Sequence, residues 1–143
     1  LIKKASDIYG NQSIMVALDI KKDIWGQHKL YSHVNRKKIN LDLFQFIRNI
    51  ESLGAGEFII NSVDNDGVMN GYDTNLIESV SKSVKVPVIA LGGAGSIKDF
   101  SSAVRHGASA VAAGSLFVYQ GIHRGVLISY LKSELLMKEL LNK

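Results

Sequence analysis

Cysteine is absent from the sequence, which excludes disulfide bonds, thiolate metal ligands and cysteine nucleophiles. No apolar run is long enough to span a bilayer, and the first residues, Leu1 to Lys4, lack the hydrophobic core and cleavage site of a signal peptide. Lysine and arginine are scattered and form no stripe interleaved with aromatic residues, which make up only 8% of the chain. We therefore expect a cytoplasmic protein whose partner is neither a membrane nor a nucleic acid.

The composition fits one globular domain over residues 1–143. The chain is 46% hydrophobic and 21% charged, which supplies enough apolar material for a single core. Its net charge of +4 fits an anionic small molecule as ligand, although a bias of this size more often serves solubility. The four histidines show no metal-ligand spacing, and we expect neither a metal site nor a cofactor.

Two apolar runs that end in small residues are the most informative feature of the chain. Residues 86–91 lead into Gly92 and Gly93, and residues 110–113 lead into Gly114 and Ser115. Buried parallel strands whose carboxyl ends open onto a ligand have this pattern. Glycine lets the backbone approach an anion, and the helix beginning at Ser96 offers unpaired N–H groups. The sequence therefore predicts a phosphate cradle built without lysine.

Strand and helix patterns alternate four times along the chain, which implies parallel strands joined by right-handed crossovers. We predict strands over 14–18, 57–63, 86–91 and 110–113, and helices over 41–53, 75–84, 96–106 and 126–141. Residues 24–34 fit a loop or irregular hairpin after the first strand. A complete (βα)8 barrel needs roughly 200 residues or more, and the chain has no initiating Met, so we expect an α/β half-barrel of TIM-barrel type, (βα)4, made of units five to eight.

Several blocks of the sequence resemble the second half of the cyclase subunit of imidazole glycerol phosphate synthase, the HisF family. They are residues 13–21, 54–67, 71–73, 86–95 and 114–115. The resemblance implies a (βα)8 cyclase that receives ammonia from a glutaminase subunit. Such an enzyme forms imidazole glycerol phosphate and aminoimidazole carboxamide ribotide in histidine biosynthesis.

Four acidic residues are candidates for the site. Asp19, at the end of the first strand, matches the family's general acid/base aspartate, and proton transfer during ring closure suits a carboxylate; a loop-capping role is the alternative. Glu57, at the opposite end of the barrel, matches the glutamate of the ammonia gate, with a structural salt bridge as the alternative. Asp64 and Asp66 could form an acid/base pair or a metal site, but a hard metal would want more oxygen ligands, and Asp66 and Gly67 fit the phosphate cradle better, with simple turn chemistry as the alternative. Asp73 fits a helix cap.

The chain also departs from the family pattern. The family usually has Ser at the position of Leu91 and a glycine-rich loop where this chain has residues 33–39, beginning with His33. Residues 115–130 are more similar to paralogues encoded with surface-polysaccharide genes. Two alternative functions therefore stay open: supply of ammonia for amidation of a surface-polysaccharide sugar, and a non-catalytic phosphate-binding half-barrel. In either case the unpaired strand edges of a half-barrel predict self-association.

Overall fold

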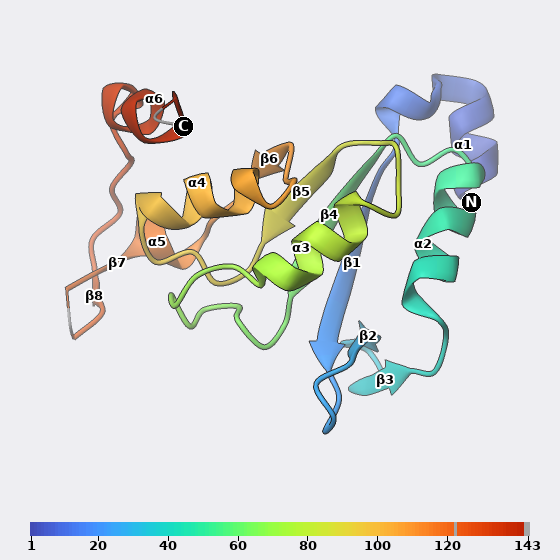
Figure 1. The fold of residues 1–143 in the computed structure, drawn as a ribbon, viewed down its shortest axis with the longest axis horizontal. Helices are drawn as coiled ribbons and strands as arrows, with labels where there is room; N and C mark the ends of the chain where they lie inside the picture. Colours follow the sequence, from blue (N-terminus) through green and yellow to red (C-terminus); the bar gives the residue numbers. More distant parts are fainter. Residues whose placement is uncertain (122, 142–143) are drawn as a thin grey trace.

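The fold is a six-stranded sheet with helices packed against it (Figure 1). The structure is a computed structural model that describes residues 1–121 and 123–141. The strand order is β3-β2-β1-β4-β5-β6. Their bounds are β1 Met15–Lys22, β2 His28–Ser32, β3 Lys37–Ile39, β4 Glu57–Ser62, β5 Val88–Leu91 and β6 Ala110–Val111. Strands β1, β4, β5 and β6 run parallel, whereas β1, β2 and β3 form an antiparallel meander. The predicted α/β class with a parallel sheet is confirmed, and its topology is that of a partial barrel.

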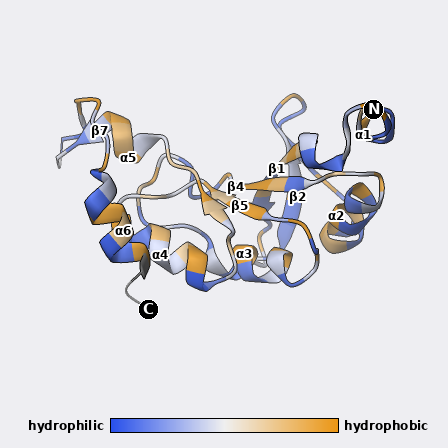
Figure 2. Ribbon diagram, turned by 90° about the horizontal axis from the view of Figure 1, so that it is seen from above, coloured by the Kyte–Doolittle hydropathy of each residue, from blue (hydrophilic) through white to orange (hydrophobic). Residues whose placement is uncertain are grey.

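Helices connect the parallel strands, and α3 and α4 lie on the same side of the sheet (Figure 2). The helices are α1 Ile2–Tyr9, η1 Asn11–Ser13, α2 Leu43–Ser52, α3 Thr74–Ser81, α4 Ile97–Arg105, α5 Ser115–Val118 and α6 Ser133–Leu141. Two of them begin at carboxylate caps, because Asp42 accepts from the Gln45 N–H and Asp73 accepts from the Leu76 N–H. The predicted capping role of Asp73 is therefore confirmed. No helix in the described part of the chain has the length and apolarity to cross a membrane.

The parallel strands have two different faces. Phe58 and Ile60 of β4, with Val88 and Ala90 of β5, are buried among the helices. The alternate residues of β4, Glu57, Ile59 and Asn61, point to the other face and are only half-buried. Successive strand residues point to opposite faces, so one face packs the core and the other is the inner wall of the incomplete barrel.

Three predicted elements differ from the structure. The first strand does not end at Asp19 but continues to Lys22, because residues 20–22 pair with β2. In residues 24–34, predicted as a loop or irregular hairpin, a hairpin does form, but it is regular, because β2 pairs antiparallel with β1; β3, which lies beyond this segment, extends the sheet further. The closing helix begins at Ser133 and not at Val126. Strand β8 (Gly125–Val126) instead pairs with β7 (Tyr119–Gln120), and the apolar residues Leu127 and Ile128 that follow are exposed.

Candidate functional site

A small hollow of about 10 Å³ lies at the carboxyl ends of β5 and β6. Its lining combines the β4–α3 loop with the segments that follow β5 and β6: Asp66, Gly67, Leu91, Gly92, Gly93, Ala94, Ala113, Gly114 and Ser115. All six residues predicted for phosphate binding are among them. The parallel register places these chain segments at one edge of the sheet, as the sequence predicted.

Gly92 and Gly93 have backbone conformations that favour glycine, with φ of +88° and +110°. A Cβ on Gly93 would collide with the carbonyl oxygen of Gly71, whose own N–H donates to the Gly93 carbonyl at 2.8 Å. A Cβ on Gly92 would lie 2.7 Å from Oδ1 of Asn61. The two glycines therefore bring the β4–α3 loop and the end of β5 into contact.

The N-terminus of α4 carries a carboxylate of its own beside the unpaired N–H groups that the sequence predicted. Ser96 does begin the helix, but the Asp99 carboxylate accepts from the N–H groups of Gly95 and Ser96 at 2.9 and 2.8 Å. This capping box occupies two donors and places a negative charge there. No hydrogen bond between described residues uses the N–H groups of Gly93 or Gly114. These groups are the available donors of the cradle.

Asp19 lies in a row of residues that crosses the inner face of the sheet. It pairs in register with Asn61 of β4, which pairs with Leu91 of β5. Asn61 donates from Nδ2 to Oδ1 of Asp19 at 2.8 Å, and His33 lies with Nε2 3.5 Å from Oδ2. The Asp19 side chain is 37% exposed, so a ligand can reach it. Its contacts within the described residues are the side chains of Asn61 on β4 and of His33 directly after β2, and no backbone N–H group of a loop.

Asn61 was not predicted as a site residue, although its place in the row links Asp19 to the hollow. A carboxylate only accepts hydrogen bonds, which fixes the amide with Nδ2 towards Asp19. Oδ1 of Asn61 is then buried and lacks a donor among the described residues, and it faces the position of Gly92. The strand periodicity alone could have placed Asn61 at a strand end. Only the register identifies Asp19 as its partner.

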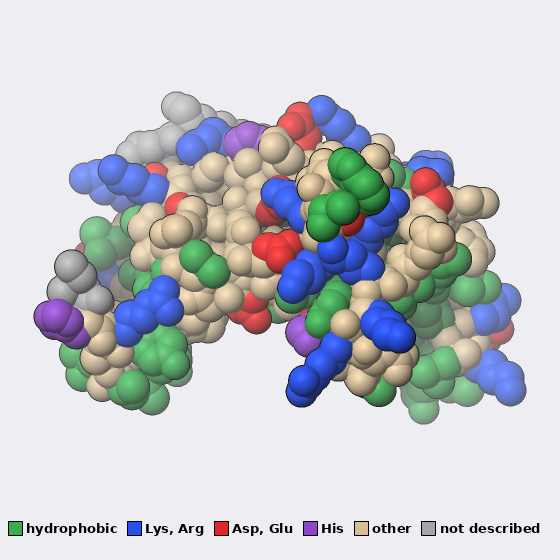
Figure 3. Space-filling view, turned by 90° about the horizontal axis from the view of Figure 1, so that it is seen from below, with side chains coloured by type: hydrophobic (Ala, Val, Ile, Leu, Met, Phe, Trp, Pro, Cys, Tyr) green, Lys and Arg blue, Asp and Glu red, His purple; other side chains and the backbone are tan. Residues whose placement is uncertain are grey.

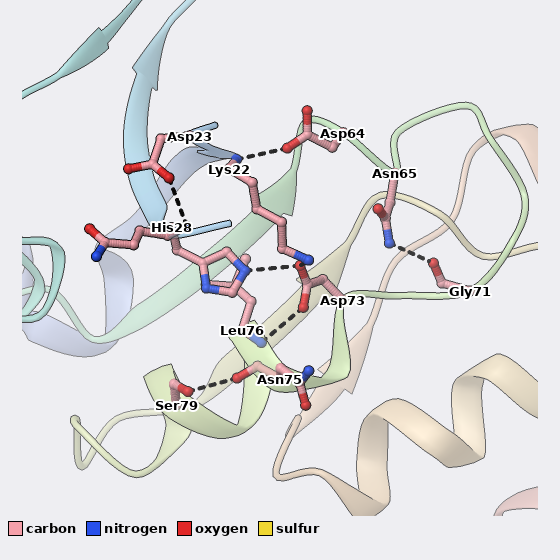
Figure 4. Close-up of polar contacts among 11 residues, drawn as sticks. Lys22, Asp23, His28, Asp64, Asn65, Gly71, Asp73, Asn75, Leu76 and Ser79 are labelled. Carbon is pink, nitrogen blue, oxygen red and sulfur yellow. Dashed lines mark hydrogen bonds and ion pairs between the residues drawn. The ribbon is translucent and has the colours of Figure 1, made fainter. Parts of the chain in front are cut away.

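A second polar cluster joins the β1–β2 hairpin to α3 (Figure 4). Asp73 is 8% exposed and binds His28 Nε2 at 2.9 Å and Lys22 Nζ at 2.7 Å. Burial raises the pKa of Asp73, but the hydrogen bonds from His28, Lys22 and the Leu76 N–H outweigh it and hold this pKa well below its usual range. Asp64 accepts from the Lys22 N–H at 2.7 Å. These contacts fix the hairpin that carries Asp19.

Glu57 begins β4 at the opposite end of the inner face from Asn61. The two lie four residues apart on one strand, a distance of about 13 Å. Glu57 is half-buried and belongs to none of the ion pairs found between described residues. The structural salt bridge considered as an alternative is therefore absent from the described part of the chain.

The view onto the carboxyl ends of the parallel strands shows a surface that is hollowed between two lobes (Figure 3). Lys and Arg side chains gather beside acidic ones around an apolar protrusion. Exposed Ile24 and Trp25 lie at the tip of the hairpin, next to Lys22. Arg124 donates to the Val68 carbonyl at 3.0 Å, beside the loop that contributes Gly67. Across residues 1–121 and 123–141, no three His, Asp or Glu side chains come together as a metal site would require.

Comparisons with known proteins identify the family of the chain. The model of the family described as histidine biosynthesis protein matches residues 1–124. The chain is 43% identical over 136 residues to the imidazole glycerol phosphate synthase subunit HisF of Endomicrobium trichonymphae, covering 94% of this chain and 52% of that protein. It is 43% identical over 120 residues to the same-named subunit of Petrotoga mobilis, covering 83% and 48%. A provisionally named subunit hisF2 of Pseudomonas aeruginosa is 44% identical over 131 residues, covering 91% and 52%. The chain spans about half the length of the curated relatives it matches.

Proposed function

Because the chain belongs to the histidine biosynthesis protein family, we propose that it is the phosphate-binding half of a HisF-type cyclase subunit. The observation that carries the proposal is that Gly92 and Asn61 connect the hollow to Asp19. The hollow holds Gly92, and the same glycine makes room for Asn61, which binds Asp19. A phosphorylated substrate held in the hollow would therefore extend along the inner face towards the carboxylate.

The proposed chemistry divides between backbone and side chains. The N–H groups of Gly93 and Gly114, together with those of Gly67 and Ser115, bind the phosphate without a lysine, whereas the N–H of Asp66 donates to the Ser62 carbonyl. Asp19 moves protons on and off nitrogen and oxygen as ammonia adds and the ring closes. The family resemblance also implies a second catalytic carboxylate. It lies in the first half of the barrel and not in this chain. Turnover is therefore a property of this chain combined with the first four units, called here the complete barrel.

Substitution of glycines in the cradle is expected to remove phosphate binding. A Cβ at Gly114 meets no atom within 4 Å, so Gly114→Val leaves the backbone undisturbed and places a branched side chain at the hollow. We expect the affinity for inorganic phosphate, measured by calorimetry, to fall at least about tenfold in this variant. Gly93→Val should have an equal or larger effect, because its Cβ also strikes the Gly71 carbonyl.

Gly26→Val is the matched control for the cradle variants. Gly26 has a φ of +78° and open space around it, but lies at the hairpin tip away from the hollow. Its phosphate affinity should equal that of the unsubstituted chain. Unchanged affinity in both Gly93→Val and Gly114→Val would show that the phosphate binds elsewhere.

We further propose that Glu57 is part of the entrance through which ammonia from a glutaminase partner reaches the inner face. Its position at the far end of the strand from Asn61 supports this role, since the strand length separates the two chemistries. In the complete barrel with its glutaminase, Glu57→Gln should lower glutamine-driven turnover severalfold and leave ammonium-driven turnover unchanged. Equal loss in the two assays, or no loss in either, would return Glu57 to a structural role.

A second candidate function is amidation of a surface-polysaccharide sugar, and Leu91 favours it. This side chain occupies the third position in the row with Asp19 and Asn61, where the resemblance leads us to expect Ser. An apolar group there removes a hydrogen-bonding partner next to the substrate. Ammonium-driven turnover of the phosphorylated histidine-pathway substrate by the complete barrel would support the first function, and its absence the second.

We also propose that the chain by itself associates with a second copy. Strands β3 and β6 are the two edges of the sheet, and Met15 on the inner face is 50% exposed. Unpaired edges and an uncovered apolar face recruit other strands. Light scattering should therefore give a mass of at least twice 15.6 kDa at high concentration. A monodisperse monomer that unfolds cooperatively would contradict this proposal.

A further inference from the structure

One carboxylate oxygen of Asp19 accepts a hydrogen bond from a side chain, and the other has an imidazole nitrogen within ion-pair distance. Oδ1 accepts from Nδ2 of Asn61 at 2.8 Å, and Oδ2 lies 3.5 Å from Nε2 of His33. The two partners come from different sides of β1, because Asn61 lies on the parallel neighbour β4 and His33 directly follows the antiparallel neighbour β2. A carboxylate held at only one oxygen is free to rotate about its Cβ–Cγ bond. Contacts at both oxygens restrict that rotation.

The imidazole of His33 is itself oriented by its neighbours. Its ring meets Tyr31 edge to face, with ring centroids 5.0 Å apart and an angle of 87°. Nζ of Lys21 lies 5.3 Å from the centroid of the same Tyr31 ring. Edge-to-face packing favours one ring orientation over a freely rotating imidazole. A carboxylate only accepts hydrogen bonds, so this contact can hold the carboxylate when the facing nitrogen carries a hydrogen.

We propose that His33 is a positioning residue for Asp19: the imidazole donates to Oδ2, and with Asn61 it fixes the plane of the carboxylate towards the substrate. The inference rests on the catalytic role proposed for Asp19. It adds a residue outside the blocks that carry the family resemblance, in the segment where the family usually has a glycine-rich loop. Each carboxylate oxygen has a second lone pair, so the two contacts leave acceptor sites free for the reaction. His33 itself does not touch the substrate.

The first test compares two substitutions of His33 in ammonium-driven turnover by the complete barrel. His33→Gln keeps an N–H donor of similar reach, whereas His33→Leu removes the donor. We expect the leucine variant to lower kcat about tenfold with little change in KM, because it disturbs the orientation of Asp19 and not substrate binding. The glutamine variant should stay within about twofold of the parent. The His33 side chain is 61% exposed, so neither change threatens the core.

Either of two results would overturn the proposal: an unchanged kcat in His33→Leu, or an equal loss in the two variants. The first would mean that Asp19 needs no second partner. The second would mean that donation to Oδ2 is not what His33 contributes.

The second test uses the chain alone and needs no turnover. In nitrogen NMR spectra of the histidine rings, Asp19→Asn should shift the Nε2 resonance of His33, because the charged acceptor is lost. His106 is the internal control, since its Nδ1 contacts the Ser102 carbonyl at 2.7 Å and Asp19 is not its partner. A His33 resonance that does not respond would show that the contact is not formed. That result would leave the proposed role of Asp19 intact, so the two ideas fail separately.

Discussion

Asp19→Asn in the complete barrel is expected to lower ammonium-driven turnover by a factor of about 100 to 10,000, the usual contribution of a positioned acid/base group. Asparagine has the shape of aspartate but neither takes up nor releases a proton at neutral pH. The affinity for inorganic phosphate should stay unchanged, because the cradle lies at β5 and β6 and Asp19 does not line it. Steady-state kinetics and calorimetry on the same preparation provide the two measurements.

Asp64→Asn is the control for the loss of one negative charge at this end of the sheet. Asp64 accepts from the Lys22 N–H, and an asparagine oxygen can accept in the same place. Its turnover should remain within a few-fold of the parent. Turnover that is unaffected by Asp19→Asn would exclude the acid/base role, and the non-catalytic phosphate-binding half-barrel would become the better description.

The second large effect is expected on stability, from Asp73→Ala. This carboxylate is buried, caps α3, and binds Lys22 and His28 of the hairpin. Its removal leaves Lys22 and His28 without their acceptor and the helix without its cap, so the free energy of unfolding in urea should fall by about 3 kcal/mol. Asp42→Ala is the matched control: Asp42 caps α2 but is exposed, and its loss should cost about 1 kcal/mol. Equal losses would mean that the ion pairs of Asp73 contribute nothing.

The lowered pKa of Asp73 also predicts how this contribution depends on pH. In the unfolded chain an aspartate has a pKa of about 3.9, above that of Asp73 in the folded protein. The stability from Asp73 is therefore fully present above about pH 5 and is lost as the pH falls through the folded pKa. The difference in unfolding free energy between the parent and Asp73→Asn should be constant near neutrality and shrink below about pH 4. A difference that grows in acid would contradict the assignment.

The sequence predicted those parts of the molecule that depend on local patterns. The alternation of strands and helices, the glycine-rich strand ends and the cap at Asp73 all follow from residues close together in the chain. The partners of Asp19 could not be predicted, because Asn61 and His33 reach it only through strand pairing on its two sides. The capping box of Asp99 was overlooked, although Ser96 and Asp99 have the spacing that would have revealed it.

The C-terminal segment shows a different reason why structure could not be predicted from the sequence. Residues 126–128 are apolar and suit either a helix or an extended strand, and short apolar runs do not distinguish the two. Pairing of Val126 with Tyr119 decides in favour of the strand. The Leu127 N–H also donates to the Val118 carbonyl at 2.9 Å. The residues that make these contacts lie several positions away in the chain, so the pattern of residues 126–128 alone could not predict the strand.

The two faces of β4 and β5 separate positions where substitutions affect stability from positions where they affect ligand binding. Phe58, Ile60, Val88 and Ala90 are at most 1% exposed and hold the strands to the helices, so changes there alter stability first. Asn61 and Leu91 on the opposite face are only half-buried, and substitutions there alter what the inner wall offers a ligand. A set of variants restricted to the inner wall could therefore change substrate preference while the protein stays folded. This separation of stability from binding is what lets one fold acquire new chemistry.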